Sequence, residues 1–424
     1  MITDQDISVH NEQKFKVHSS EIQHLETKLQ DKGFDVKNII SDLARFQVAI
    51  PSWALGTGGT RFGRFPGGGE PTSLEEKIAD VGLLHKLNAS SGAISLHIPW
   101  DIPENTNQLI ALAKEHNLAF DAVNSNTFQD QPNAEVSYKF GSLCHIDPGI
   151  RKAAVDHNKE VIRIGKELDS KALTIWLADG STFPGQHNLR GALQRTHESL
   201  ASIYDDLPED WKLLLEYKPY EPNFYSMVIP DWGTSFLLVS KLGEKARTLV
   251  DLGHHLPNTN IEQIVAVLMS ESKLGGFHFN DSKYGDDDLT VGSLKPYQMF
   301  LIFNELVDGM RNTQNPEISW MIDASHNLKD PLEDLLQSVE AILIAYAQAL
   351  IVDRKSLALA QEKNDVARAQ EILQDAYRTD VRPLVAAARM QSGAALDPIS
   401  LYRSAEVRSR LVKERGLHAV ATGL

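Results

Sequence analysis

Eight short apolar runs alternate with helical patterns along this 424-residue chain, and this alternation most constrains the fold. Strands separated by helices form parallel sheets, because each crossover helix returns the chain to the same edge. Eight such units over about 280 residues predict an α/β fold, a closed (β/α)8 or TIM barrel. The alternative is an open doubly wound sheet, but no Gly-x-Gly-x-x-Gly turn follows the first run. The expected strands are 46–50, 93–98, 119–123, 172–176, 213–217, 247–252, 275–280 and 318–323.

Helical segments flank the expected barrel on both sides. Apolar side chains recur near helical spacing in residues 20–45, so 1–45 is predicted as an N-terminal helical segment. The barrel is expected over residues 46–350. Residues 351–424 are predicted as a C-terminal helical extension that packs on the barrel or on another subunit. Its apolar stripe consists of Val366, Ala369, Leu373 and Ala376.

Charge and composition narrow the classes of partner. The formal net charge of −15 opposes binding to phosphate backbones and anionic lipid, so neither a nucleic acid nor a membrane is expected as partner. The polar N-terminus lacks the apolar core of a signal peptide, and no apolar run approaches the length of a membrane span. A single cysteine, Cys144, excludes an intrachain disulfide and suits a reducing compartment. These features predict a soluble cytoplasmic protein.

Polar or aromatic side chains stand at or just after the end of nearly every expected strand. The carboxyl ends of barrel strands converge on one mouth, so these side chains are expected to meet there. One such residue is easily a cap or turn residue, but that explanation is weak for the whole set. The set comprises Trp53, His97, Asn124, Asn126, Trp176, Asp179, Glu216, Lys218, Asp251, His254, His278, Asp286, Asp288 and Asp323.

Carboxylates and imidazoles dominate the second half of this set. Oxygen and nitrogen donors without thiolates suit divalent ions such as Mn²⁺, Co²⁺, Mg²⁺ or Zn²⁺ in a non-structural site. Seven donors are more than one ion needs, so the pattern predicts two ions that share a carboxylate. The predicted metal ligands are Glu216, Asp251, His254, His278, Asp286, Asp288 and Asp323.

Each motif also has an ordinary structural explanation. The aspartate run 286–288 resembles a solvated surface, but its position after a strand that contains His278 favours a site. Glu216 alone would be interpreted as one member of a buried ion pair. Lys218, two residues later, points to the same side of an extended strand, so a metal-binding carboxylate and an ammonium group could lie together at the mouth. In VDLGHH, we expect His255 to be only a hydrogen-bonding neighbour of the site.

A glycine-rich stretch, residues 51–71, follows the first expected strand. It lacks the Gly-Lys-Ser/Thr ending of a nucleotide-binding P-loop, so nucleotide binding is rejected. It is either a long surface loop or a flap that carries aromatic side chains to a pocket. Trp53, Phe62 and Trp176 would then wall the pocket, with His97 placed to bind a substrate hydroxyl or ring oxygen.

Two neighbouring cations beside an ammonium group suit carbohydrate chemistry. Such cations can bind vicinal hydroxyls and polarise a carbonyl, and Lys218 could stabilise a developing alkoxide. This fits aldose–ketose isomerisation, either by a hydride shift between C1 and C2 or through an enediol. The same ligands could hydrolyse a phosphoester, but the net charge and the lack of strand-end arginines disfavour phosphorylated substrates.

Several long motifs resemble the bacterial L-rhamnose isomerases of broad specificity, which also interconvert D-allose and D-allulose. The motifs are PSWALGTGGTRFGRFPG, SLHIPWD, NSNTF, EYKPYEP, VDLGHHLPNTNIE, GGFHFNDSKYGDDD and MIDASHN. The resemblance implies a metal-dependent (β/α)8 enzyme, usually a homotetramer that uses two Mn²⁺ ions per subunit. It departs at Tyr217, where histidine is expected; Tyr217 should face away from the mouth.

The resemblance also implies roles for individual residues. Glu216, Asp251, His278 and Asp323 would hold a structural ion, and Glu216, His254, Asp286 and Asp288 a catalytic one. Lys218 would contact the sugar near C1 or C2, and His97 would serve ring opening. Phe62 would enter from a neighbouring subunit. The expected catalytic residues are therefore Lys218, Glu216, Asp323 and His97, and the expected substrate-binding residues are Trp53, Phe62, His97, Trp176 and Lys218.

Three alternatives remain open at this point. The first is a ketose 3-epimerase or another sugar isomerase on the same scaffold. The second is a metal-dependent phosphodiesterase. The third is a sugar-binding protein without catalytic activity.

Overall fold

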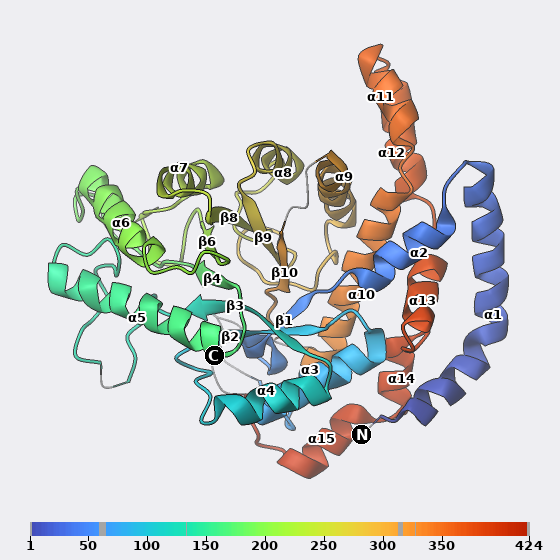
Figure 1. Ribbon diagram of the computed structural model, residues 1–424, viewed down its shortest axis with the longest axis horizontal. Coiled ribbons are helices and arrows are strands. Elements are labelled where there is room, and N and C mark those ends of the chain that lie inside the picture. The colour runs from blue at the N-terminus through green and yellow to red at the C-terminus, as the bar shows by residue number, and fades with distance from the viewer. Residues whose placement is uncertain (1, 59–64, 133, 313–316, 327, 422–424) are drawn as a thin grey trace.

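The strands close into a parallel barrel, in the order β1-β10-β9-β8-β6-β4-β3-β2. The computed structural model describes residues 2–58, 65–132, 134–312, 317–326 and 328–421 (Figure 1). The eight expected strands are all present, and the (β/α)8 prediction is confirmed. The barrel strands are β1 (Ala49–Pro51), β2 (Ala93–Ile98), β3 (Ala119–Ser125), β4 (Ala172–Ile175), β6 (Lys212–Glu216), β8 (Ala246–Asp251), β9 (Leu274–Phe279) and β10 (Ser319–Ile322).

A ring of helices covers the barrel, one after each strand (Figure 1). Side-chain caps begin most of them: Asn260, for example, accepts a hydrogen bond from the Gln263 amide. Because helices cover the outer face, most residues of the strands are buried, and the majority of them are apolar. The ring helices are α3 (Leu74–Asn88), α4 (Thr106–Glu115), α5 (Pro148–Glu167), α6 (Leu189–Tyr204), α7 (Trp232–Leu242), α8 (Ile261–Ser270), α9 (Pro296–Asn312) and α10 (Pro331–Leu350).

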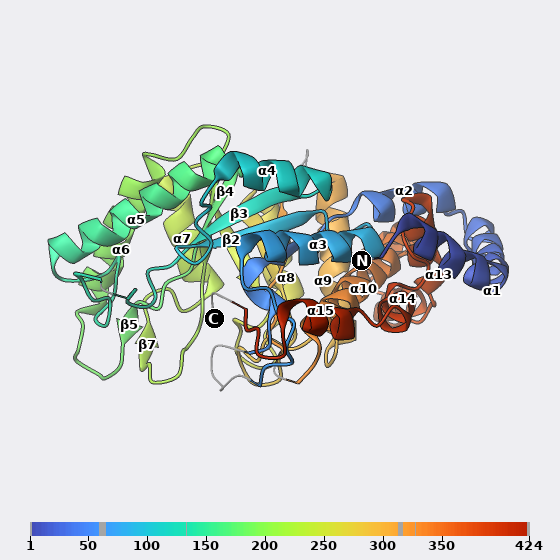
Figure 2. The ribbon, with the colours of Figure 1, turned by 90° about the horizontal axis from the view of Figure 1, so that it is seen from below.

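The loops that follow the strands gather on one side of the barrel (Figure 2). The short helix η1 (Ser52–Leu55) follows β1 there, and β5 (Gly180–Ser181) pairs with β7 (Ser226–Met227) in a small antiparallel sheet. These loops form the mouth to which the strand ends point.

The N-terminal helical segment differs from its expected form. Instead of one helical stretch over 20–45, α1 spans Asp4–Asp31 and α2 spans Val36–Arg45. The helix starts early because Thr3 and Asp6 form a reciprocal capping box. It stops where Gly33 takes φ +84°, a left-handed conformation that favours glycine.

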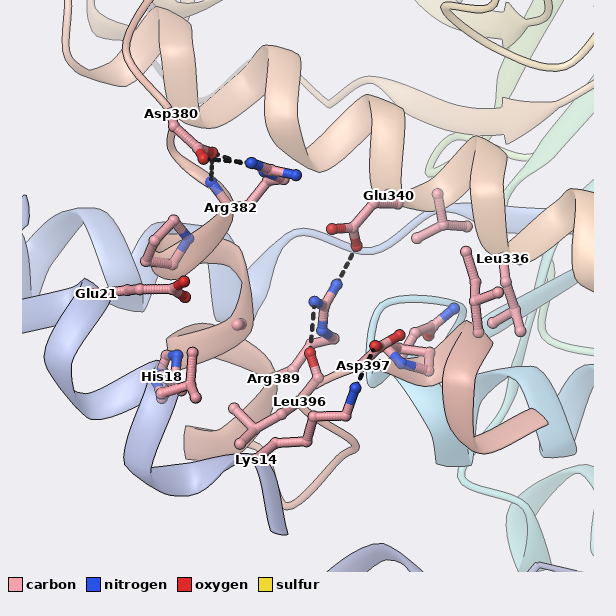
Figure 3. Close-up of a pocket in the computed structure, with 17 residues that line it drawn as sticks. Lys14, His18, Glu21, Leu336, Glu340, Asp380, Arg382, Arg389, Leu396 and Asp397 are labelled. Carbon is pink, nitrogen blue, oxygen red and sulfur yellow. Dashed lines mark hydrogen bonds and ion pairs between the residues drawn. The ribbon is translucent and has the colours of Figure 1, made fainter. Parts of the chain in front are cut away.

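The C-terminal extension packs with this segment on one side of the barrel (Figure 1). A cavity of about 400 Å³ lies between α1, α10 and α13 (Figure 3). Around it, charged side chains connect the extension to α1 and to α10. Arg389 pairs there with Glu340 of α10, and Lys14 of α1 lies 3.0 Å from Asp397. The division into three parts at residues 45 and 350 stays a prediction. The extension comprises α11 (Arg354–Glu362), α12 (Val366–Tyr377), α13 (Arg382–Gln391), α14 (Pro398–Ser404) and α15 (Val407–Arg415).

Within the described ranges, no single helix is both long and apolar enough to cross a membrane. Helices α10 and α11 pass such a test only as a pair, and they are bent by 62° at their junction.

Candidate metal and sugar site

Strand register explains why the expected ligands meet. Asp251 on β8 lies opposite His278 on β9, so both side chains project to the same face. Glu216 on β6 is paired with Leu249, two residues before Asp251, and therefore shares that face. Met321 on β10 is opposite His278, and Asp323 follows it by two. Four strand ends therefore deliver their donors to one point.

These four residues form the first cluster of possible metal ligands. One donor atom each from Glu216, Asp251, His278 and Asp323 lies within 4.8 Å of the others. This is the group expected for the structural ion. The Asp323 carboxylate is oriented by Trp53, whose indole Nε1–H donates to Oδ1 at 2.9 Å.

A second cluster lies beside the first and differs from the expected catalytic set. Here the donor atoms of Asp251, His254 and Asp286 lie within 4.8 Å of one another. Glu216 remains close, because its Oε1 lies 3.1 Å from His254 Nδ1. Two carboxylates, Glu216 and Asp251, thus stand between the clusters, whereas the sequence indicated only Glu216 as shared.

Asp288, the remaining expected ligand, is buried beside Asp286 and Asp323. Its backbone takes φ +50°, and its Oδ2 accepts a hydrogen bond from Ser325 Oγ at 3.1 Å. Burial, together with the charges of Asp286 and Asp323, raises the pKa of Asp288 well above its ordinary value. A nearby cation would relieve this repulsion.

The donors fit divalent cations. Five acidic side chains and two imidazoles converge in a largely buried space, and Asp251 Oδ2 is buried without a hydrogen-bond partner among the described residues. Burial, with the neighbouring carboxylates, raises the pKa of Asp251 to about 7 although His254 opposes this. A buried carboxylate oxygen without a hydrogen bond is costly inside a protein unless a cation lies nearby, and His278 Nδ1, at 3.8 Å, compensates it only in part. The oxygen-rich donor set matches Mn²⁺ or Mg²⁺ well.

Histidines partly neutralise the acidic cluster without a metal. Burial opposes protonation of His278, but Glu216, Asp323 and Asp251 raise its pKa to about 9. Conversely, burial raises the pKa of Glu216, yet His278 and His254 bring it down to about 2. Metal binding to these imidazoles must therefore displace protons.

A cavity of about 730 Å³ opens over both clusters. Its size suits a small polar ligand. Trp53, His97, Trp176, Lys218 and Asn124, all members of the strand-end set, line this cavity, and their roles in binding stay a prediction. Phe62 lies outside the described residues, so its placement stays a prediction.

Lys218 is held by ionic and aromatic contacts. Its Nζ pairs with Asp286 and Glu221 and lies 5.0 Å from the ring centroid of Trp176. Since Lys218 is 4% exposed, its charge acts in a space largely free of water. The sequence pattern did not lead us to predict Glu221 as a site residue. Its place three residues after Lys218 in EYKPYEP was the available signal.

The sequence also missed two aromatic residues of the cavity wall. Trp100 lies 4.3 Å from the His97 ring and Phe128 lies 5.5 Å from it, measured between centroids. Both line the cavity, and both belong to motifs already noticed, SLHIPWD and NSNTF. Nothing in those motifs distinguished a wall residue from a core residue.

Other residues near the strand ends, Tyr217, His255 and Asp179, have structural partners. Tyr217 is buried, and its hydroxyl lies 2.6 Å from His255 Nε2, so the two residues bind each other behind the site. The carboxylate of Asp179 accepts hydrogen bonds from the Ser142 and Cys144 amides and anchors a loop.

His97 is expected to make stability depend on pH. Burial lowers the pKa of His97 to about 3 in the folded chain. The unfolded chain therefore takes up the proton first, and this contribution to stability is complete above about pH 6.5 and is lost as pH falls toward 3. In His97→Gln, the stability lost between pH 6.5 and pH 4.5 should be smaller by roughly 2 kcal/mol. Urea unfolding at both pH values measures the free energy of unfolding. His24→Gln, at an exposed position, is the control. Equal losses of stability between the two pH values in the parent and in His97→Gln would contradict the expectation.

Fold and site together define a TIM-barrel protein with a mouth suited to divalent cations. Residues 89–327 match the family described as xylose isomerase-like TIM barrel, and the chain belongs to this family. It is 51% identical over 389 residues to a probable sugar isomerase of Mesorhizobium japonicum, covering 92% of this chain and 90% of that protein. It is 48% identical over 424 residues to a probable sugar isomerase of Rhizobium meliloti, covering 100% and 98%.

A solved structure of an L-ribulose 3-epimerase is similar in fold alone. It superposes with a TM-score of 0.51 at 12% identity, covering 76% of this chain and 98% of that one.

Proposed function

We propose that this chain is a metal-dependent aldose–ketose isomerase that interconverts L-rhamnose and L-rhamnulose, and also D-allose and D-allulose. The observation that carries the proposal is the position of Lys218 beside two adjacent donor clusters in one cavity. The names of the two bacterial relatives support the same class of reaction. The preference for these sugars comes from the motifs that resemble L-rhamnose isomerases.

The residues divide the work as follows. Glu216, Asp251, His278 and Asp323 would hold one Mn²⁺ ion, and His254, Asp286 and Asp288 would hold the other together with a shared carboxylate. When bound, such ions hold sugar hydroxyls and polarise the carbonyl. During transfer of hydrogen between C1 and C2, negative charge develops on the oxygen bonded to C1 or C2. Lys218 donates a hydrogen bond to this oxygen. His97, uncharged at neutral pH, accepts a hydrogen bond from the anomeric hydroxyl of the closed sugar.

The aromatic wall would bind the carbon skeleton. Rings of Trp53, Trp100, Phe128 and Trp176 line the cavity and can cover the C–H faces of a sugar while they exclude water. Their low polarity strengthens the electrostatic interactions of the Lys218 ammonium group, which lies over the Trp176 ring. We further propose that the protein works in the cytoplasm as a homotetramer, with Phe62 contributed by a neighbouring subunit.

Two incubations test the proposed reaction. The manganese-loaded protein should form L-rhamnulose from L-rhamnose and D-allulose from D-allose. Absence of a ketose from both sugars would contradict an isomerase of this type. Conversion of D-fructose to D-allulose without either aldose reaction would indicate a 3-epimerase. In D₂O, the proposed hydride shift between C1 and C2 should leave both carbons free of solvent deuterium, whereas an enediol would introduce it.

Asp286→Asn should impair turnover far more than folding. The first cluster keeps its four donors and Lys218 keeps Glu221, although the amide weakens the contacts of residue 286 with His254 and Lys218. We expect kcat/KM to fall at least about 100-fold, while the metal-free protein stays folded and loses up to about 3 kcal/mol of unfolding free energy. Steady-state kinetics and urea unfolding measure the two effects. Asp287→Asn changes the exposed neighbouring aspartate and serves as control; equal losses in both variants would contradict a specific role for Asp286.

A further inference from the structure

The segment 416–421 lies against the end of the glycine-rich stretch. The Gly69 amide donates to the Gly416 carbonyl at 2.9 Å, and Arg408 and Arg415 donate to the Gly69 carbonyl at 3.2 and 3.3 Å. Gly69 has φ +68°, and a Cβ there would lie 2.6 Å from the Val412 amide nitrogen. Only glycine permits this approach, so the two segments are closely fitted.

Glu70 joins this contact to the loop after β1. Its side chain is fully buried and accepts hydrogen bonds from two separate segments. Oε1 accepts from the amide and the hydroxyl of Thr57, at 3.0 and 2.6 Å, and Oε2 accepts from the Ala421 amide at 2.9 Å. One carboxylate therefore accepts hydrogen bonds from donors of two separate segments of the chain.

Thr57 is directly connected to the mouth of the barrel. The next residue, Gly58, lines the cavity and exchanges two backbone hydrogen bonds of 3.1 Å with His326. Four residues before Thr57, Trp53 lines the cavity and donates to Asp323. Thr57 thus lies in the same short loop as a wall residue of the cavity and the hydrogen-bond partner of a possible metal ligand.

We propose that Glu70 is a positioning residue that clasps the segment 416–421 to the Thr57 turn and so holds Trp53 and Gly58 in place for sugar binding. The C-terminal extension then shapes the active site of its own chain, in addition to packing on the barrel. The kinetic part of this inference rests on the proposed function, whereas the structural part does not.

Two variants loosen the clasp in different ways. Glu70→Gln keeps the shape but turns one acceptor into a donor that faces an amide N–H. Gly56→Ala adds a methyl group that would lie 2.4 Å from Ala421 Cβ and 2.7 Å from Glu70 Oε2, and so displaces the segment 416–421. Should Glu70→Gln not fold, Gly56→Ala decides the question. The matched control is Glu340→Gln, which breaks another carboxylate contact between the barrel and the extension, at Arg389 (Figure 3).

Hydrogen exchange and kinetics provide separate readouts. Exchange of the Thr57 and Gly58 amides, followed by mass spectrometry of peptides spanning 49–58, should accelerate about tenfold or more in both clasp variants. KM for L-rhamnose should rise roughly tenfold with kcat within about threefold, since binding contacts are lost and Lys218 is untouched. Glu340→Gln should change neither.

The outcomes separate the two proposals. Unchanged exchange in the clasp variants, equal acceleration in Glu340→Gln, or faster exchange without a rise in KM would overturn the positioning role. If the parent protein converts no sugar, the proposed function fails, and the exchange measurement alone decides whether the clasp exists.

Discussion

Glu216→Gln is expected to abolish isomerisation and to lower the bound manganese. Glu216 Oε1 lies 3.1 Å from His254 Nδ1 and 3.3 Å from His278 Nδ1, so this carboxylate stands between the two clusters. The amide removes a full negative charge from both proposed sites at once and places a donor against the imidazoles. We expect kcat/KM to fall by at least about 1,000-fold, a loss of the order expected when a group acts in both binding and catalysis.

The measurement combines steady-state kinetics with metal analysis of the dialysed protein. Glu244→Gln makes the same change of charge at an exposed position just before β8 and should leave both quantities unaltered. A Glu216→Gln protein that holds two ions and turns over L-rhamnose at the parental rate would contradict a shared ligand at this position.

Lys218→Met is expected to reduce kcat while the metals stay bound. Methionine keeps much of the length and the contact with Trp176 but removes the ammonium group that pairs with Asp286 and Glu221. Removal of one preorganised donor from a water-poor site typically costs about 100- to 1,000-fold in kcat. Metal content should not fall, because the carboxylate of Asp286 loses a competing cation.

A control for this variant stands on the same strand. Lys212 begins β6 at the opposite end of the barrel and lies 3.5 Å from Glu317. Lys212→Met should therefore retain parental kcat and KM. A parental kcat in Lys218→Met, or an equal loss in both variants, would remove Lys218 from the proposed chemistry.

Much of the barrel could be predicted from the sequence because its strands are short apolar runs buried on both faces. Each expected strand lies within a few residues of the observed one, as with 247–252 and β8 (Ala246–Asp251). The first helix could not be bounded in this way, since α1 is largely solvated and buries few apolar side chains, among them Ile7 and Leu25. Its capping pair, Thr3 and Asp6, was the signal that was overlooked.

The clusters were predictable as a set of residues but not as an arrangement. Convergence at the mouth follows from the topology, so Glu216 and Asp323 could be assigned to one site although 107 positions separate them in the printed sequence. Which carboxylate the two clusters share depends on the directions of the side chains, and Asp251 contributes a donor atom to both clusters. Glu70 gave no local signal, because its partners Thr57 and Ala421 are brought to it only by the packing of the extension.

Anomalous diffraction from crystals grown with manganese tests the central claim most directly. We expect two manganese peaks in each chain, one among Glu216, Asp251, His278 and Asp323 and one beside His254 and Asp286. A fully loaded crystal without a peak at these strand ends, or with manganese bound only elsewhere, would contradict the account.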